Sequence, residues 1–311
     1  EKIRYLISEK NADPQSILAL TFTEKAAEDM LVRVDEIMPL GYEEPWLSTF
    51  HSFCDRILRE SGMEIGLDPD FEIMTGTEQW LFLREHLFEL GLDYYLPLGN
   101  PSKFISALLK LFSRAQDENV SVNEFQDFVQ IRNSKLEIRN AEENKQKAEG
   151  GQRSAEEEEL LKLHELAGAY TKYQELKIDA SVMDFGDLIA WTIKLFRDRP
   201  SVLKKYREQF EYILVDEFQD TNYAQYQLIK ILAPPEENPD LMVVGDDLQS
   251  VYKFRGASLS NILKFKEDYT DSESIVLNKD YRNPQPIIDA ATKLGRENEP
   301  NTLESRIGID K

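Results

Sequence analysis

The sequence predicts an α/β protein whose core is a parallel β-sheet. Two largely apolar stretches, Tyr212–Val215 and Leu241–Gly245, end abruptly at acidic residues, and a third, Ile17–Phe22, leads directly into a helix. Short apolar runs that alternate with amphipathic helices are typical of buried parallel strands. A long stretch with helical periodicity and no strand pattern, from about residue 80 to residue 178, predicts a mostly helical insert within this α/β frame.

Composition and charge limit the classes of protein to which the chain can belong. At 311 residues it exceeds the usual size of one domain, so we expect two or three units. A formal net charge of −21 excludes a protein that coats nucleic acid by bulk attraction, so any nucleic-acid contact must be local. A single cysteine, Cys54, and three scattered histidines offer neither an internal disulfide nor a zinc site.

The expected location of the protein follows from the same inspection. No apolar run approaches the length of a membrane span, and the first residues lack a signal-peptide pattern. We therefore expect a cytoplasmic protein with no membrane partner. The chain begins with Glu1 and not with Met, so we also expect a fragment of a longer protein.

The first two strands each lead into a helix through a short polar turn. After Ile17–Phe22, the hydroxyl of Thr23 is expected to cap the next helix. Either Phe22 is buried and Thr23 only caps, or the turn faces phosphates while Phe22 stacks on a base. A second short strand, Trp46–Thr49, precedes a helix at whose start His51 either contacts a phosphate or serves as a cap.

The helical stretch contains a strongly charged segment. Residues 134–159 are dominated by Glu, Lys, Gln and Asn, which predicts a solvated helical arm or a disordered loop. An amphipathic helix follows, and Asp184 is then expected to cap a further helix. Phe185, next to Asp184, is either a core residue or a platform for a base.

The central prediction concerns the acidic ends of two strands. Tyr212–Val215 delivers Asp216 and Glu217 to the carboxyl edge of the sheet, where open α/β sheets bind ligands. One acid can hold Mg²⁺ while its neighbour orients an attacking water, so this pair suits phosphoryl transfer to water. The alternative is an acidic turn that caps the next helix. Leu241–Gly245 also ends at acids, Asp246 and Asp247, and Gln249 beyond them is suited to sensing a terminal phosphate.

The last part of the chain carries further candidates. Tyr252, Phe254 and Arg255 occupy a loop in which they either pack on the core or stack on bases. A final strand is expected at Ile275–Leu277, followed by Tyr281 and Arg282 just before a helix. Arg282 is either an arginine finger that reaches a γ-phosphate or a surface arginine.

The order of these motifs resembles the UvrD/Rep/PcrA family of superfamily 1 DNA helicases. The segments that carry the resemblance are Ala19–Ala27, Ser48–Phe53, Met183–Phe185, Leu214–Asn222, Val244–Ala257 and Leu277–Asn283. The resemblance implies a RecA-like fold of the P-loop NTPases with a helical accessory domain, called 1B. It places the first RecA-like domain, 1A, at residues 1–78 and 181–272, domain 1B at 79–180, and the start of domain 2A at 273–311.

The resemblance also implies a function, cofactors and partners. Such relatives move 3′ to 5′ on single-stranded DNA, use ATP and Mg²⁺, meet duplex DNA, and work with repair or replication proteins. Asp216 resembles the family's Mg²⁺ ligand, Glu217 its catalytic base, Gln249 its γ-phosphate sensor, Arg282 its arginine finger and Tyr281 its adenine-stacking residue. The residues that resemble its DNA-contacting set are Phe22, Thr23, His51, Phe185, Tyr252, Phe254 and Arg255.

The chain departs from the family pattern in one large respect. No Gly-x-x-x-x-Gly-Lys-Ser/Thr loop occurs, which we interpret as truncation, and the lost strand before that loop would leave an unpaired sheet edge. We therefore expect this chain alone to hydrolyse little or no ATP. Two alternatives remain: a non-hydrolysing module that binds single-stranded DNA, and the helicase part of a helicase–nuclease of the AddA/RecB type.

Overall fold

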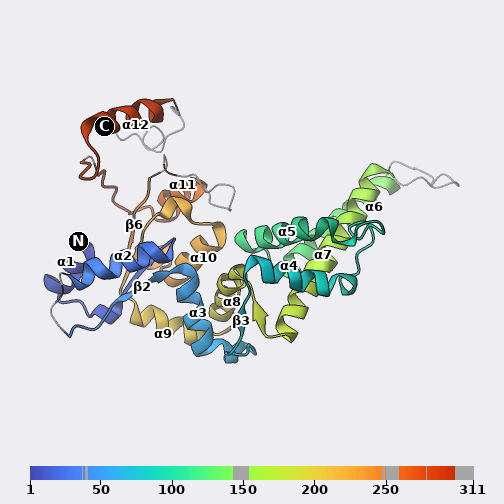
Figure 1. The fold of residues 1–311 in the computed structure, drawn as a ribbon, viewed down its shortest axis with the longest axis horizontal. Helices are drawn as coiled ribbons and strands as arrows, with labels where there is room; N and C mark the ends of the chain where they lie inside the picture. Colours follow the sequence, from blue (N-terminus) through green and yellow to red (C-terminus); the bar gives the residue numbers. More distant parts are fainter. Residues whose placement is uncertain are drawn as a thin grey trace. The chain divides into compact units, whose positions relative to one another are not determined.

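The computed structural model describes residues 1–36, 38, 41–142, 154–246, 249, 259–277 and 279–297. The chain divides into two compact units (Figure 1). Residues 1–53 and 200–311 form the first, here called the sheet unit, and residues 54–199 form the second, here called the helical unit. Tyr252, Phe254 and Arg255 lie outside the described residues.

A four-stranded parallel sheet forms the centre of the sheet unit. The strand order is β2–β1–β5–β6, with bounds Trp46–Thr49, Ile17–Thr21, Tyr212–Val215 and Asp240–Val243. All three neighbouring pairs are parallel, and the register matches Leu20 with Val215 in β1 and β5, and Val215 with Val243 in β5 and β6. The parallel sheet with its helices confirms the predicted α/β class, and the two acid-tipped strands lie side by side, as expected.

Burial differs between the centre and the edge of this sheet. All five residues of β1 are buried, because strands pair with it on both sides and helices cover it. β6 ends the sheet among the described strands, and Met242 of β6 and Val244, which follows it, are 41% and 38% exposed. An unpaired edge with exposed apolar side chains is a surface that another strand could cover.

Helices surround the sheet and begin at the expected caps. The helices of this unit are α1 Lys2–Ser8, α2 Glu24–Asp35, the start of α3 Phe50–Ser61, α9 Pro200–Gln209, α10 Tyr223–Leu232, α11 Leu259–Asp268 and α12 Gln285–Arg296. Short 3₁₀ turns are η1 Pro14–Ser16, η5 Phe218–Asp220 and η6 Pro235–Glu237. The Thr23 hydroxyl accepts from the Ala26 N–H at 3.1 Å, which confirms the predicted cap of α2. Trp46 packs edge-on against Phe210 with ring centroids 5.1 Å apart, which joins β2 to the segment after α9.

The prediction of a strand at Ile275–Leu277 is wrong. These residues form no strand, and their exposed fractions are 79%, 44% and 83%. A strand needs a hydrogen-bonding neighbour, and no described strand lies beside this segment. An apolar, β-branched sequence favours the extended state only where such a neighbour is present.

The helical unit has its own hydrophobic core. Its elements are the rest of α3, η2 Gly62–Ile65, β3 Glu72–Ile73, α4 Gly76–Glu85, η3 Leu87–Glu89, η4 Pro101–Phe104, α5 Ile105–Asp117, α6 Val122–Glu142, α7 Ala155–Asp179, β4 Val182–Met183 and α8 Phe185–Asp198. β3 and β4 pair in parallel. Leu83, Leu108, Phe112, Tyr170 and Tyr173 are among the buried residues that pack α4, α5 and α7 together. Cys54 is fully buried.

The charged segment 134–159 is helical at both of its ends. α6 continues to Glu142 and α7 starts at Ala155, where Ser154 and Glu157 form a capping box. Val129 of α6 is fully buried against a cluster with Leu160 and Ala167 of α7. The predicted helical arm is therefore present in the described parts of this segment.

Within the described residues, no helix combines the length and apolar character that crossing a membrane requires.

Candidate active site

The carboxyl ends of the four parallel strands bring several predicted site residues to one edge of the sheet. Phe22 and Thr23 follow β1, and His51 lies in the first turn of α3 after β2. Asp216 and Glu217 follow β5, and Gln249 lies shortly after β6. Strand ends of one direction project into a common crevice, so the topology alone groups these residues.

Asp216 is the first residue beyond β5. Its N–H donates to the carbonyl oxygen of Leu20 at 2.9 Å, which extends the pairing of β5 with β1 by one residue. The carboxyl group is partly buried, and burial raises its pKa, with a further increase from the neighbouring charge of Glu217. A carboxylate held in this way is stabilised when a cation approaches it.

Glu217 has an unusual backbone conformation. Its φ of 50° and ψ of 42° lie in the left-handed region, which costs a non-glycine residue about 1–3 kcal/mol. The next residue helps to hold this turn, because the Phe218 N–H donates to the Val244 carbonyl at 2.9 Å. The side chain of Gln219 also donates, from Nε2 to Glu217 Oε2, at 2.6 Å. The strained turn therefore directs Glu217 with support from the neighbouring strand.

Gln219 links the ends of the two strands, and sequence inspection did not single it out. Its side chain is buried, and its Oε1 accepts from the Asp246 N–H at 3.1 Å. A Cβ atom on Gly245 would lie 2.9 Å from that oxygen, so a larger residue there would displace the Gln219 side chain. Gln249 Nε2 in turn donates to Asp246 Oδ2 at 2.7 Å. A continuous set of hydrogen bonds thus joins Glu217 to Gln249 through Gln219 and Asp246.

A second hydrogen-bonded group joins the turns after β1 and β2. The Glu24 carboxylate accepts from the hydroxyls of Thr49 at 2.8 Å and Ser52 at 2.7 Å. Burial lowers the pKa of His51, and the charge of Glu24 opposes that shift only in part. His51 therefore favours its neutral form. Thr23 caps α2 and follows β1 at the edge of the sheet where Asp216 follows β5.

The remaining candidates are placed less closely. Tyr281 is 84% exposed, with the Lys279 ammonium 4.8 Å from its ring centroid. Arg282 is exposed, and among the described residues no hydrogen bond or ion pair joins its side chain to Asp216 or Glu217. Phe185 belongs to the helical unit, where it is the first residue of α8, is 50% exposed, and follows the predicted cap Asp184.

The donor set suits a divalent cation only in combination with a ligand. Within the described ranges, no group of three or more His, Cys, Asp or Glu side chains is arranged to hold a metal. Mg²⁺ is commonly held by one or two carboxylates together with substrate phosphates. Asp216, with its raised pKa and its place at a strand end, fits an arrangement in which a carboxylate and substrate phosphates hold Mg²⁺ together.

A family model and individual relatives both show similarity to the same group of helicases. Residues 1–270 match the UvrD/REP helicase N-terminal domain. The chain is 38% identical over 298 residues to the ATP-dependent DNA helicase PcrA of Bacillus subtilis strain 168, which covers 96% of this chain and 35% of that protein. It is 36% identical over 297 residues to the PcrA helicases of Staphylococcus epidermidis and Staphylococcus aureus, with 96% of this chain and 36% of each relative covered. The chain thus spans about a third of the length of these relatives.

Proposed function

Since the chain belongs to the UvrD/REP helicase N-terminal domain family, we propose that it is part of an ATP-dependent DNA helicase that moves 3′ to 5′ on single-stranded DNA. The observation that carries the proposal is the hydrogen-bonded connection from Glu217 through Gln219 and Asp246 to Gln249 at one sheet edge. This connection supports the assignment of Glu217 as the base and Gln249 as the phosphate sensor of one site. The relatives that match are ATP-dependent DNA helicases by name.

We assign the nucleotide chemistry to residues of this edge. Asp216 would hold Mg²⁺ together with phosphate oxygens, and the ion would supply neutralisation of the charge that develops on the phosphates. Glu217 would take the proton of the attacking water, and Gln249 would orient that water or contact the terminal phosphate. We assign Tyr281 to adenine stacking and Arg282 to charge stabilisation as an arginine finger.

We assign DNA contact to a second set of residues. Phe22 and Phe185 would stack on bases, while Thr23 and His51 would contact the phosphate backbone. Tyr252, Phe254 and Arg255, which lie outside the described residues, would complete this set. Contacts to single-stranded and duplex DNA through a few rings and backbone amides are compatible with a net charge of −21, because they need no broad basic surface. Repair or replication proteins are the proposed partners.

Exposed surfaces support the proposal that further parts of the protein complete the site. The edge of β6 and the apolar side chains Ile287 and Leu294 of α12, 54% and 73% exposed, are surfaces that additional structure would cover. We propose that residues 1–78 and 181–272 form RecA-like domain 1A, residues 79–180 form domain 1B, and residues 273–311 begin domain 2A. On this proposal the chain alone hydrolyses little or no ATP.

The test is phosphate release from ATP by the complete protein, with and without oligothymidylate. We expect Mg²⁺-dependent turnover that single-stranded DNA stimulates, and displacement of a labelled strand from a duplex with a 3′ single-stranded tail. DNA binding without any turnover would contradict the helicase assignment and support a non-hydrolysing binding module. Displacement that requires a 5′ tail would contradict the proposed direction.

A further inference from the structure

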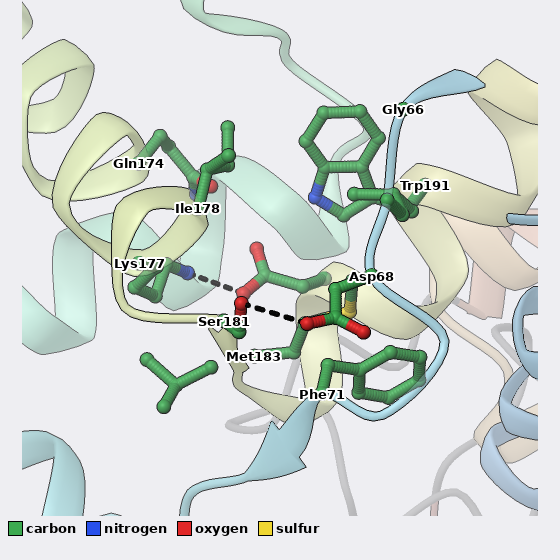
Figure 2. Close-up of a pocket in the computed structure, with 12 residues that line it drawn as sticks. Gly66, Asp68, Phe71, Gln174, Lys177, Ile178, Ser181, Met183 and Trp191 are labelled. Carbon is green, nitrogen blue, oxygen red and sulfur yellow. Dashed lines mark hydrogen bonds and ion pairs between the residues drawn. The ribbon is translucent and has the colours of Figure 1, made fainter. Parts of the chain in front are cut away.

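A buried group of charged side chains joins three helices of the helical unit. Lys177 of α7 forms ion pairs with Asp184 at 2.6 Å and with Asp187 of α8 at 2.5 Å. The three side chains are only 2%, 7% and 3% exposed. Gln116 of α5 completes the group, here called the α8 cluster, and it is also buried. Figure 2 shows Lys177 beside a small cavity, with a dashed line marking its contact with an acid.

Every oxygen of the two carboxylates in the α8 cluster has a donor. Gln116 Nε2 donates to Asp184 Oδ1 at 2.9 Å and to Asp187 Oδ1 at 2.7 Å. The two acids also form the capping box of α8, in which the Asp184 N–H donates to Asp187 Oδ2 at 2.9 Å and the Asp187 N–H donates to Asp184 Oδ1 at 3.0 Å. Each carboxylate therefore receives three hydrogen bonds, from α5, from α7 and from the first turn of α8.

The first turn of α8 lies very close to Gln116 of α5. A Cβ atom on Gly186 would lie 2.5 Å from Gln116 Oε1 and 2.7 Å from its Cδ. The glycine is thus required for the close approach of α5 to α8. Phe185 lies between Asp184 and Gly186, so both of its chain neighbours are fixed by the cluster, whereas its own side chain is 50% exposed.

The α8 cluster continues the core of the helical unit. Gln116 comes one helical turn after Phe112 in α5, and Lys177 comes one turn after Tyr173 in α7, with its ammonium 4.5 Å from the Tyr173 ring centroid. Phe112 and Tyr173 stack with centroids 5.2 Å apart. Contacts from α5 and α7 therefore connect the core of the helical unit to the start of α8.

We propose that Lys177 and Gln116 are positioning residues that fix Phe185 for stacking on a DNA base, which rests on the function proposed above. A capping box needs only Asp184, Asp187 and the backbone, so the two side chains from other helices are not needed to begin α8. Buried ion pairs add little net stability compared with apolar packing, but they impose one geometry because each bond is directional. The α8 cluster thus ties the orientation of an exposed ring to the helices of the insert.

The cavity beside the α8 cluster makes the proposal testable by substitution. It measures about 140 Å³ and is lined by Lys177, Asp187, Trp191, Phe71 and eight neighbouring residues. Ser181 at this cavity donates a hydrogen bond to Asp68 at 3.3 Å (Figure 2). Water that enters from this cavity can solvate the acids when Lys177 is shortened or made neutral. A variant can therefore stay folded while the restraint on α8 is lost.

The experiment is a double-mutant cycle on the affinity of the chain for fluorescein-labelled oligothymidylate. Phe185→Ala should weaken binding about 5- to 150-fold, the range expected for one base–aromatic stack. Lys177→Met should weaken it by a large part of that factor, and should have little further effect when Phe185→Ala is already present. Lys177→Arg, which keeps the charge and the donors, should restore at least part of the affinity. Lys194→Met, which removes an exposed ion pair from the same helix, is the matched control.

Two further measurements keep the outcome decisive. Gln116→Met removes the amide bridge but leaves the ion pairs, so it should show the same dependence on Phe185 with a smaller factor. Hydrogen exchange of the amides of residues 184–188 should accelerate in Lys177→Met, whereas that of β5 should not change. Independent, multiplicative effects of Lys177→Met and Phe185→Ala on affinity would overturn the proposal, as would unchanged exchange at the start of α8. If the unsubstituted chain does not bind DNA, the DNA-contact part of the proposed function fails, and the exchange result alone decides whether Lys177 holds this turn.

Discussion

Two pairs of acids in this chain have similar local composition and opposite surroundings. Asp216 and Glu217 lie at the end of β5 with Gln219 as a hydrogen-bonding neighbour, and Asp184 and Asp187 lie at the start of α8 with Gln116. The second pair also has a buried lysine. The first pair forms no ion pair with any described lysine or arginine, and it remains partly exposed.

The comparison teaches how a pair of acids can be assigned to chemistry or to structure. Burial and the charge of Glu217 raise the pKa of Asp216, and no described lysine or arginine forms an ion pair with it. At the start of α8, burial opposes the charge of Lys177, but the two acids outweigh burial and raise the pKa of the lysine. Asp216 and Glu217, here called the open pair, can therefore accept a metal ion together with nucleotide phosphates. The α8 cluster already contains its cation.

The largest expected effect is at the open pair. Glu217→Gln in the complete protein should reduce DNA-stimulated ATP turnover about 10²- to 10⁴-fold, because the amide cannot accept the proton of the attacking water. Affinity for Mg²⁺–ATP, measured by equilibrium dialysis, should change little. Turnover within a factor of two of the unsubstituted protein would show that Glu217 is not the base.

The next largest effect is on stability at the α8 cluster. Lys177→Met leaves two buried carboxylates without their cation and should lower the free energy of unfolding by about 3–5 kcal/mol. Urea denaturation of the chain, followed by circular dichroism, measures this loss. Lys194→Met, which breaks an exposed pair on α8, should cost no more than about 0.5 kcal/mol. Equal losses in the two variants would show that the buried ion pairs of the α8 cluster contribute no more to stability than an exposed pair does.

Loss of the Gln219 bridge between β5 and β6 should have a smaller effect, and that effect should be on ATP turnover. Gln219→Leu removes the donor to Glu217 and the acceptor for the Asp246 N–H, so kcat should fall about 10- to 100-fold. Gln219→Glu retains an acceptor but adds a negative charge beside Glu217, so it should shift the pH profile of turnover to higher pH as well. A change in KM for ATP with kcat unchanged would contradict a role in holding Glu217.

The smallest effect is the pH dependence of stability. Burial and the charge of Asp184 raise the pKa of Asp187 to about 6, while Lys177 opposes the shift. The groups that face Asp187 are Lys177, Asp184, Tyr170 and Tyr173.

A raised carboxyl pKa gives stability that is complete below about pH 4 and is lost as the pH rises through about 6. Between pH 5 and pH 7.5, the unsubstituted chain should lose about 1 kcal/mol of unfolding free energy relative to Asp187→Asn. Urea denaturation at the two pH values measures the difference. A constant difference would show that Asp187 does not titrate in this window.

Features that depend on local sequence could be predicted. Ile17–Phe22 and Tyr212–Val215 are apolar runs of strand length, and Thr23 and Asp184 cap their helices as the pattern indicated. Asp216, Glu217 and Gln249 could be grouped, because parallel strands end at a common edge. The same local reasoning failed for Ile275–Leu277, since the strand pattern says nothing about whether a partner strand is available.

Features that depend on tertiary contact could not be predicted. Gln116 is 68 residues from Asp184 in sequence, and neither side chain carries a signal that they meet. Lys177 looks like any other lysine of a charged helix until α8 packs against it. Gln219 offered a weak signal, because its position two residues after Glu217 suits a contact across a tight turn, but its link to Asp246 requires the neighbouring strand.

The most direct test measures both ATP turnover and unfolding free energy on one variant, Asp216→Asn, in the complete protein. If the open acids serve chemistry, turnover should fall about a hundredfold or more, because the amide binds the metal ion poorly. The free energy of unfolding should stay the same or rise, because neutralising a partly buried acid with a raised pKa relieves the cost of burying its charge. Full turnover in this variant, or a loss of turnover that follows a loss of folding, would contradict the account.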